Sequence, residues 1–275
     1  MKKVLLATSI LAASAGFAAA EVAVSGSARM GLIYDGDDTY FSSRVRIVFT
    51  ASGETDGGLS FGASVRADQS GQGGDYPNTE NDDSTVYISG AFGKLTFGDN
   101  DSAALTMVGQ VSAVGFTGLG SYNEVWHGSH TDTSALYEYS TGALSFAVST
   151  GQVGEEEYSL GVKYATDAFS VALGWEGGDG AGADRIYLGG SGTFGAATVK
   201  AVVADFDDGS DTDFALSVDY VTGAATITAF YHDYYEAFGL GASYDLGGGA
   251  AVKGGVVNLG VYDDTIADIG ITMSF

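Results

Sequence analysis

The sequence predicts an all-β fold, a transmembrane antiparallel β-barrel of about sixteen strands. Three observations predict it: the composition, an alternation of apolar and polar side chains with a period of two, and aromatic residues at the strand ends. The 275 residues include 43 glycines, 16 tyrosines, 15 phenylalanines and a single proline. Such a composition is typical of extended strands joined by tight turns. The chain has no cysteine, which excludes a disulfide scaffold, a thiolate zinc site and cysteine catalysis.

The first element is expected to be a signal peptide, residues 1–20, that is cleaved on export. Two lysines at residues 2–3 precede an apolar run over 4–11, and three alanines at 18–20 suit a signal-peptidase site. The apolar run is too short to span a membrane as a helix. We therefore expect one mature domain, residues 21–275. Loss of the two leading lysines leaves nine basic side chains against 35 acidic ones, a formal net charge of −26. So few basic side chains make nucleic acid an unlikely ligand class.

The mature chain reads as a series of two-faced strands. In the stretch 41–51, for example, Val45, Ile47 and Phe49 share one parity, while Arg44 and Arg46 share the other. A soluble sandwich would turn the apolar face inward, whereas a transmembrane barrel turns it toward lipid. Strands of about nine to eleven residues, and a final alternating strand that ends in an aromatic residue, favour the barrel. Aromatic residues expected to form its interfacial girdles are Tyr34, Phe41, Phe92, Tyr164, Phe169, Trp175, Phe194, Phe206, Tyr220 and Tyr244.

The connections between these strands alternate between short turns and longer acidic loops. Of the 35 acidic residues, 28 fall in or beside the long set, so one end of the barrel should be strongly acidic. The longest connection, about 35 residues, runs from Asp99 to Thr133, and its stretch 103–108 is expected to form a short helical turn.

Several motifs together give the mature chain a family resemblance. They are Ser42-Ser43-Arg44-Val45-Arg46, the run from Gly53 to Ala63, the run from Ile88 to Leu95, and the terminal Phe275. With the signal-like start, these motifs resemble the general porins of Gram-negative bacteria, in particular the Rhodobacter-type porins. The resemblance implies a sixteen-stranded barrel in the outer membrane, a homotrimer, and a long third loop folded into the lumen as a constriction.

Basic residues are expected to gather on one part of the inner wall. Four of the five arginines, Arg29, Arg44, Arg46 and Arg66, lie on the first three strands with the polar parity. Their distances along the strands place Arg29 and Arg66 near mid-height. We interpret the four as the basic wall of a pore constriction, with ordinary polar lining as the alternative.

The third loop can supply opposing acids. Asp99 and Asp101 open it, and Glu124 follows its uncharged middle. If these carboxylates face the arginines, the narrowest point carries a transverse field that screens solutes by charge and size. The alternative for these acids is plain solvation of the loop.

The predicted function is passive diffusion of small hydrophilic solutes and ions through a barrel embedded in outer-membrane lipid, with no enzymatic activity and no cofactor. Loose binding of Ca²⁺ or Mg²⁺ at the acidic loops is an alternative to a solvated acidic rim. The three histidines, His127, His130 and His232, are expected to lie in loops. His127 and His130 are too poorly accompanied for a metal site, and an enzyme would depend on a serine paired with His232. A substrate-selective channel also fits the pattern, as does an adhesin barrel that holds a partner with its acidic loops.

Ion selectivity stays open at this level. The arginine wall favours anions, while the acidic loops favour cations, and the formal charge of −26 inclines the prediction toward cations.

Overall fold

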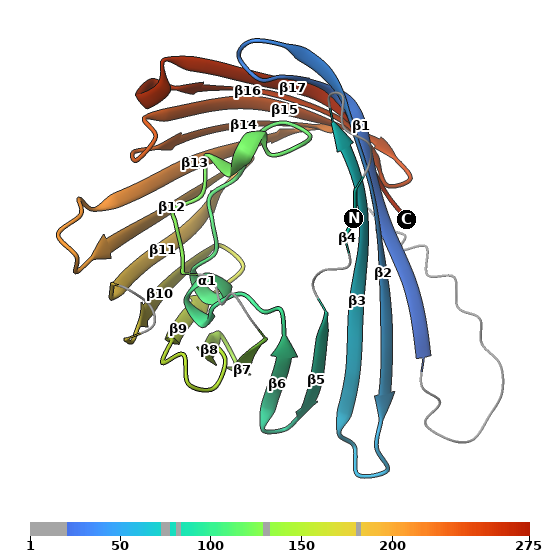
Figure 1. Cartoon of the computed structure of the whole chain (residues 1–275), viewed down its shortest axis with the longest axis vertical. Helices are drawn as coiled ribbons and strands as arrows, with labels where there is room; N and C mark the ends of the chain where they lie inside the picture. Colours follow the sequence, from blue (N-terminus) through green and yellow to red (C-terminus); the bar gives the residue numbers. More distant parts are fainter. Residues whose placement is uncertain (1–20, 73–77, 81–83, 129–132, 180–182) are drawn as a thin grey trace.

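Antiparallel pairing of neighbouring strands builds nearly all of the described chain into one sheet, seen in the computed structural model of Figure 1. The structure describes residues 21–72, 78–80, 84–128, 133–179 and 183–275. Residues 1–20, the expected signal peptide, lie outside this described part. The strands are β1 (Glu21–Tyr34), β2 (Thr39–Glu54), β3 (Ser60–Gln72), β4 (Asn78–Glu80), β5 (Thr85–Gly90), β6 (Gly93–Gly98), β7 (Ser134–Thr141), β8 (Leu144–Thr150), β9 (Tyr158–Ala165), β10 (Phe169–Gly177), β11 (Arg185–Phe194), β12 (Ala197–Phe206), β13 (Asp213–Thr222), β14 (Ala225–His232), β15 (Ala237–Gly247), β16 (Ala250–Leu259) and β17 (Asp264–Ser274). Three short helices complete the described elements: α1 (Ala103–Val108), η1 (Leu119–Ser121) and η2 (Gly260–Tyr262).

The sheet closes on itself because its first and last strands pair. β1 pairs with β17 from Ser27↔Ser274 to Tyr34↔Ala267, and Gly26 and Phe275 exchange backbone hydrogen bonds of 2.8 and 3.0 Å. The short β4 and β5 both pair with β3, at different heights, and so share one place in the ring. Within the described residues the barrel therefore has sixteen strand positions, as the sequence predicts.

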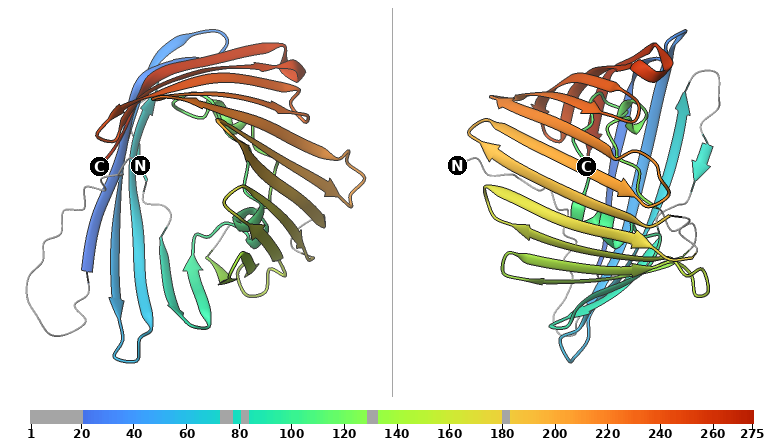
Figure 2. Two further views of the ribbon diagram at one scale, coloured as in Figure 1. Left: turned by 180° about the vertical axis from the view of Figure 1, so that it is seen from behind. Right: turned by 90° about the vertical axis from the view of Figure 1, so that its left-hand side faces the viewer.

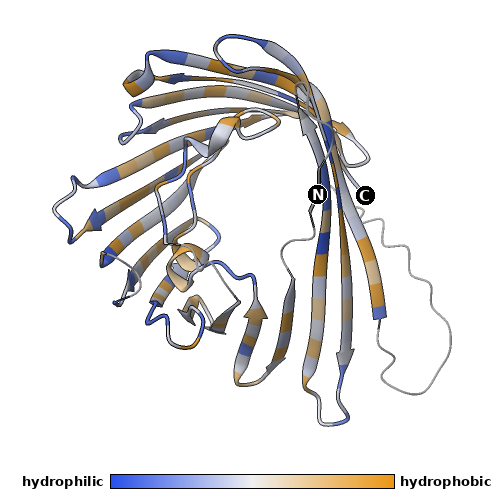
Figure 3. Ribbon diagram, in the orientation of Figure 1, coloured by the Kyte–Doolittle hydropathy of each residue, from blue (hydrophilic) through white to orange (hydrophobic). Residues whose placement is uncertain are grey.

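The apolar faces of the strands lie on the outside of the barrel. Val45, Ile47 and Phe49 on β2 are exposed, as are Phe214 and Leu216 on β13. The alternation of apolar and polar residues along the ribbons is visible in Figure 3. Large apolar side chains thus face the surroundings rather than one another, which is the arrangement of a barrel in hydrocarbon and the reverse of a soluble sandwich.

The two ends of the barrel differ as the loop lengths predict. Tight turns at one end of the barrel join β2 to β3, β5 to β6, β7 to β8, β9 to β10, β11 to β12, β13 to β14 and β15 to β16. The longer connections lie at the other end, among them the third loop, residues 99–133. Figure 2 shows the ring from behind and from one side. No helix in the described part of the chain is long and apolar enough to cross a membrane.

Two expectations about individual residues are wrong. Phe206 does not belong to an outer aromatic girdle, because it packs inward against a buried cluster that contains Val202 and Ala204. Its parity on β12 is that of the buried residues. His232 is not a loop residue: it ends β14 and its side chain is 1% exposed.

Helix α1 opens the third loop and packs against the inner faces of β8 to β11. It occupies the stretch expected to be helical. The close approach depends on glycines in the wall. A Cβ added at Gly174 would lie 2.7 Å from the Cβ of Ala104, and one at Gly161 would lie 2.4 Å from the carbonyl oxygen of Ala103. Only residues without a side chain at these two wall positions let the helix lie directly on the sheet.

We predict that Gly174→Val displaces α1. The added side chain overlaps with Ala104, which should lower stability by about 1–3 kcal/mol. The measurement is the midpoint of unfolding in detergent, together with single-channel conductance.

The matched control is Gly190→Val on β11. Gly190 pairs with the outward-facing Val171, and a Cβ there would meet only the Ser170 carbonyl oxygen at 3.3 Å. Equal unfolding midpoints and conductances for the two variants would contradict the proposed role of Gly174.

Candidate functional site

The four arginines singled out in the sequence lie side by side on the inner wall. Strand pairing places Arg29 on β1 directly opposite Arg44 on β2, and Arg46 directly opposite Asp68 on β3. Arg66 lies on β3 two residues before Asp68. Because opposed residues of an antiparallel pair have neighbouring side chains, the register alone gathers these groups into one patch.

Asp68 is the carboxylate that holds this patch together. It accepts hydrogen bonds from Nε and Nη2 of Arg46 at 2.9 and 2.8 Å, and lies 3.1 Å from Nε of Arg66. One carboxylate thus serves two guanidinium groups, so the described residues of this patch carry more positive than negative charge. The sequence contained a signal for this contact, since the hairpin around 55–59 pairs residue 46 with residue 68.

The tip of the third loop lies against the same patch. Arg29 Nη1 donates to the carbonyl oxygen of Thr117 at 3.2 Å, and its guanidinium lies 6.0 Å from the ring centroid of Phe116. Asp268 on β17 accepts from the backbone N–H groups of Phe116 and Thr117, at 3.0 and 2.8 Å, and from the Thr117 hydroxyl at 2.6 Å. Asp268 is 6% exposed. The loop therefore crosses the lumen and ends beside the arginines.

Before its tip, the third loop is held against the opposite wall of the barrel by small polar side chains. The N–H groups of Ala103 and Ala104 donate to the hydroxyls of Ser149 and Ser159 at 2.9 and 2.8 Å. Ser112 donates its N–H to the Ser217 hydroxyl at 3.0 Å. These contacts satisfy backbone groups of the loop that would otherwise be buried without partners.

Glu176 on β10 contacts both ends of the third-loop segment that crosses the lumen, at Ser102 and at Gly128. Its carboxylate accepts from the Ser102 hydroxyl, which also caps α1, and from the Gly128 N–H at 2.7 Å. The Tyr187 hydroxyl donates to the same carboxylate at 2.8 Å. Glu176 is 2% exposed, so this network fixes the loop from the interior of the protein. Glu176 and Asp268 were not singled out in the sequence.

The three acids expected to face the arginines make no direct contact with them among the described residues. Asp99, Asp101 and Glu124 are exposed, and no ion pair or hydrogen bond of the described residues joins them to the four arginines. Asp101 lies near enough to His127 to act on its charge, while Glu124 lines a cavity at the loop end of the barrel. The acids that act on Arg29 are Asp68 and Asp268.

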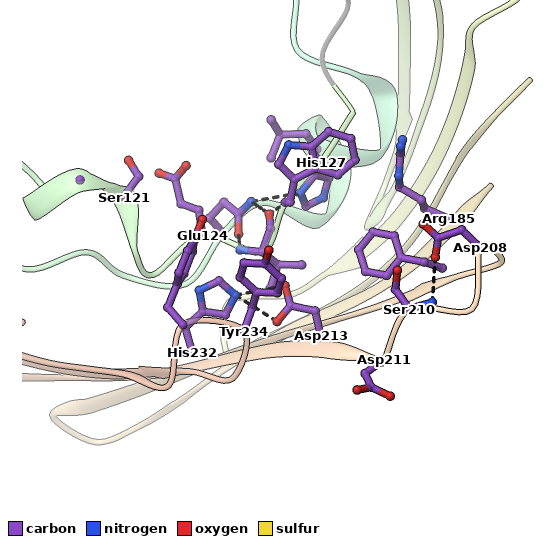
Figure 4. A pocket seen from close by; sticks show the side chains of 17 residues that line it. Ser121, Glu124, His127, Arg185, Asp208, Ser210, Asp211, Asp213, His232 and Tyr234 are labelled. Atoms are coloured by element: carbon purple, nitrogen blue, oxygen red, sulfur yellow. Dashed lines mark hydrogen bonds and ion pairs between the residues drawn. The ribbon is translucent and has the colours of Figure 1, made fainter. Parts of the chain in front are cut away.

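That cavity, of about 840 Å³, lies between the third loop and the loops that follow β12 and β14. Trp126 stacks on Arg185, with the guanidinium 4.1 Å from the ring centroid, and the His127 ring stacks on Tyr187 at 4.0 Å. Figure 4 shows Arg185 and Asp208 on one side of the cavity, Glu124 and His232 on the other, and Tyr234 between them.

The histidines have structural partners. Both ring nitrogens of His232 are engaged, by the carbonyl oxygen of Tyr122 at 2.8 Å and by Asp213 at 3.0 Å, and no serine is among these partners. His130 and the acidic pair Asp82–Asp83 lie outside the described residues. Within the described part of the chain, no group of three or more histidines and carboxylates is placed to hold a metal ion.

Comparisons with known proteins point in one direction. Residues 7–263 match the family described as Gram-negative porin. The porin of Rhodobacter capsulatus is 37% identical over 308 residues, which cover 93% of this chain and all of that protein. The porin of Fuscovulum blasticum is 26% identical, with 93% and 100% covered.

Solved structures agree. A porin structure refined at 1.8 Å resolution superposes with a TM-score of 0.76 at 33% identity, over 93% of this chain and 100% of the other. An engineered variant of the Rh. blastica porin has a TM-score of 0.80 at 23% identity over the same shares, which is a likeness of fold.

We predict that Asp268→Asn loosens the tip of the third loop. An amide keeps one acceptor oxygen but loses the charge that attracts three donors, a loss of about 1.5–3 kcal/mol per charged hydrogen bond at most. Single-channel recordings should show higher and noisier conductance.

Asp263→Asn is the matched control, because Asp263 is exposed and lies near the loop end of β17 without contact to the third loop. Unchanged current noise in Asp268→Asn would show that the contacts of the Asp268 carboxylate with Phe116 and Thr117 do not hold the loop.

Proposed function

The chain belongs to the Gram-negative porin family and forms a passive channel through the bacterial outer membrane, and we propose that a charged constriction in its lumen screens the small hydrophilic solutes and ions that cross. The barrel lies among outer-membrane lipids and is not an enzyme. The basic side of the proposed constriction consists of Arg29, Arg44, Arg46 and Arg66. The tip of the third loop forms its other side.

One observation carries this proposal: among the described residues, the four arginines outnumber the carboxylates that contact them, directly beside a loop that crosses the lumen. Arg46 and Arg66 share Asp68, while Arg44 has no ion-pair partner among the described residues. A positive surface at the narrowest point attracts anions and repels cations. Rings or walls of charge select ions in this way without binding one solute tightly.

We further propose that acids at the loop end act on ions at longer range. Asp99, Asp101 and Glu124 are exposed on the third loop, and the outer loops carry further carboxylates. Such a mouth concentrates cations ahead of the constriction. The channel would then be cation-preferring as a whole, with the arginine wall reducing that preference.

We predict that the double variant Arg44→Ala/Arg46→Ala becomes more cation-selective. Removal of two unit charges changes the energy of an ion about 8 Å away, one Debye length at physiological ionic strength, by roughly 1 kcal/mol in water before screening. The cation-to-anion permeability ratio should therefore rise about two- to fivefold. The measurement is the reversal potential of the channel in a planar bilayer under a salt gradient.

Two further variants make the sign of the effect decisive. Asp68→Asn leaves the arginines and removes their carboxylate, so the reversal potential should move the opposite way. Lys94→Ala removes a positive charge that pairs with Glu138 at 3.7 Å, away from the arginine patch, and should change little. An arginine double variant that behaves like Lys94→Ala would remove the constriction from the proposal and leave the channel.

We also propose that three chains associate, because part of the wall is too low to face lipid by itself. β5 and β6 have six residues each and β8 has seven, whereas β2 has sixteen. At about 3.3 Å per residue and roughly 45° tilt, six residues rise about 14 Å, against an apolar band about 25 Å tall. Contact with neighbouring copies would cover this low wall.

Residues 1–20 are proposed to be a signal peptide that is removed on export. Loss of 20 residues from 275 leaves a chain of 255 that starts at Glu21. Native mass spectrometry of the protein extracted from outer membranes is expected to give the mass of three such chains. A monomer mass, or chains that keep residues 1–20, would overturn the respective part of this proposal.

A further inference from the structure

The cavity at the loop end is built differently from the constriction. Its walls come from the third loop, at Leu105, Gln110 and the stretch 120–127, from the start of β11, and from the ends of β12 and β14 with the loops that follow them. Its volume, about 840 Å³, is within the range of small-molecule sites. The four arginines of the proposed constriction do not line it. A solute that enters from the loop side meets this cavity outside the constriction.

The unengaged charge in the cavity is negative. The one arginine in its lining, Arg185, stacks on Trp126 and lies 3.8 Å from the buried Glu176 carboxylate. Burial lowers the pKa of His127, which favours its neutral form. By contrast, Glu124 and Asp208 are exposed, and hydrogen bonds from Ser210 lower the pKa of Asp208, which keeps it ionised. Together with Asp211, which is also exposed in the lining, these carboxylates act on anything that enters.

Aromatic rings line the same cavity and are open to water. Trp126 is 56% exposed and Tyr234 is 69% exposed. The guanidinium of Arg185 already lies over the Trp126 ring, so this ring makes a cation–π contact within the protein itself. Aromatic faces next to carboxylates attract cations that carry an apolar body, because the ring quadrupole and the negative charge act together.

The buried His127 ring completes the lining. The Nδ1 atom of His127 lies 3.0 Å from both the Val125 carbonyl oxygen and the Gln110 amide nitrogen, whereas its Nε2 atom is buried without a hydrogen-bond partner. The side chain is 8% exposed. A buried polar atom without a partner is uncommon in a folded protein. When Nδ1 donates to Val125, Nε2 is an acceptor that suits the N–H of a protonated amine, whereas a quaternary ammonium group would be held by the rings and carboxylates alone.

We propose that this cavity binds an organic cation, a protonated amine or quaternary ammonium group on an apolar body. Trp126 and Tyr234 contact the apolar body and the cationic head, and Glu124 and Asp208 supply the opposing charge. A neutral saccharide would also stack on the rings, but it would leave both carboxylates without a counter-charge. The geometry therefore favours the cation.

Intrinsic fluorescence tests the proposal directly, because the chain has only two tryptophans. In the Trp175→Phe background, Trp126 alone reports on the cavity. Benzyltrimethylammonium chloride should give a saturable change in emission of the detergent-solubilised protein. Potassium chloride at equal ionic strength and neutral benzyl alcohol should not. The complementary Trp126→Phe variant should show no saturable change.

Variants then separate the carboxylates from the rings. Glu124→Gln/Asp208→Asn and, separately, Tyr234→Leu should each weaken binding about tenfold or more. Asp37→Asn removes an exposed carboxylate from the loop between β1 and β2, outside the cavity, and should leave the affinity unchanged. The Arg44→Ala/Arg46→Ala variant should also bind the cation with unchanged affinity. Binding in this cavity and selectivity at the constriction are therefore tested independently.

Three outcomes would overturn the proposal. Equal titration by benzyl alcohol would show a merely apolar cavity. Saturation by maltose without saturation by benzyltrimethylammonium would identify a saccharide site. Unchanged cation affinity in Glu124→Gln/Asp208→Asn, with conductance equal to that of the parent protein, would show that the carboxylates do not recognise the head group.

Discussion

The closed ring of backbone hydrogen bonds is the constraint on which the rest of this structure depends. Hydrocarbon offers no partner to an N–H or a carbonyl group, so a sheet that crosses a membrane has no free edge. Here β1 and β17 supply the closure, and the terminal Phe275 still exchanges hydrogen bonds with Gly26. Closure also fixes which strands are neighbours across the seam, and that brings Asp268 of β17 close enough to Arg29 of β1 for its charge to act on that side chain.

A barrel of this width has no continuous dry core, and its third loop takes over part of that role. The loop carries apolar side chains to both inner walls. Val111 and Val125 join a cluster on β11 to β13, and Val114 and Leu119 join another on β14 to β16. Between these clusters the loop is held by carboxylates and serines of the wall. Burial and hydrogen bonding therefore position one segment that stabilises the barrel from within and narrows its lumen.

The sequence is informative wherever the structure is periodic or local. Alternation predicts which face of each strand meets lipid, and turn spacing predicts the sixteen positions and the acidic end. The inward parity of Arg44 and Arg46 is readable, and so is the pairing of residues 46 and 68 across one hairpin. Asp268 is different, because its contact with Thr117 spans 151 residues and exists only after the ring closes. The same holds for Glu176 with Ser102, and for the inward position of Phe206, whose parity differs from that of an outer girdle.

Asp268 links architecture to electrostatics in a way that limits how the channel can vary. Its carboxylate holds the loop tip through Phe116 and Thr117, and its charge acts on Arg29. A change that neutralised residue 268 would make the arginine patch more positive and would release the loop in the same step. Among the described residues, in contrast, Asp68 contacts only side chains of the wall. Wall charge can therefore be adjusted at Asp68 without moving the loop, whereas at Asp268 the charge and the width of the lumen change together.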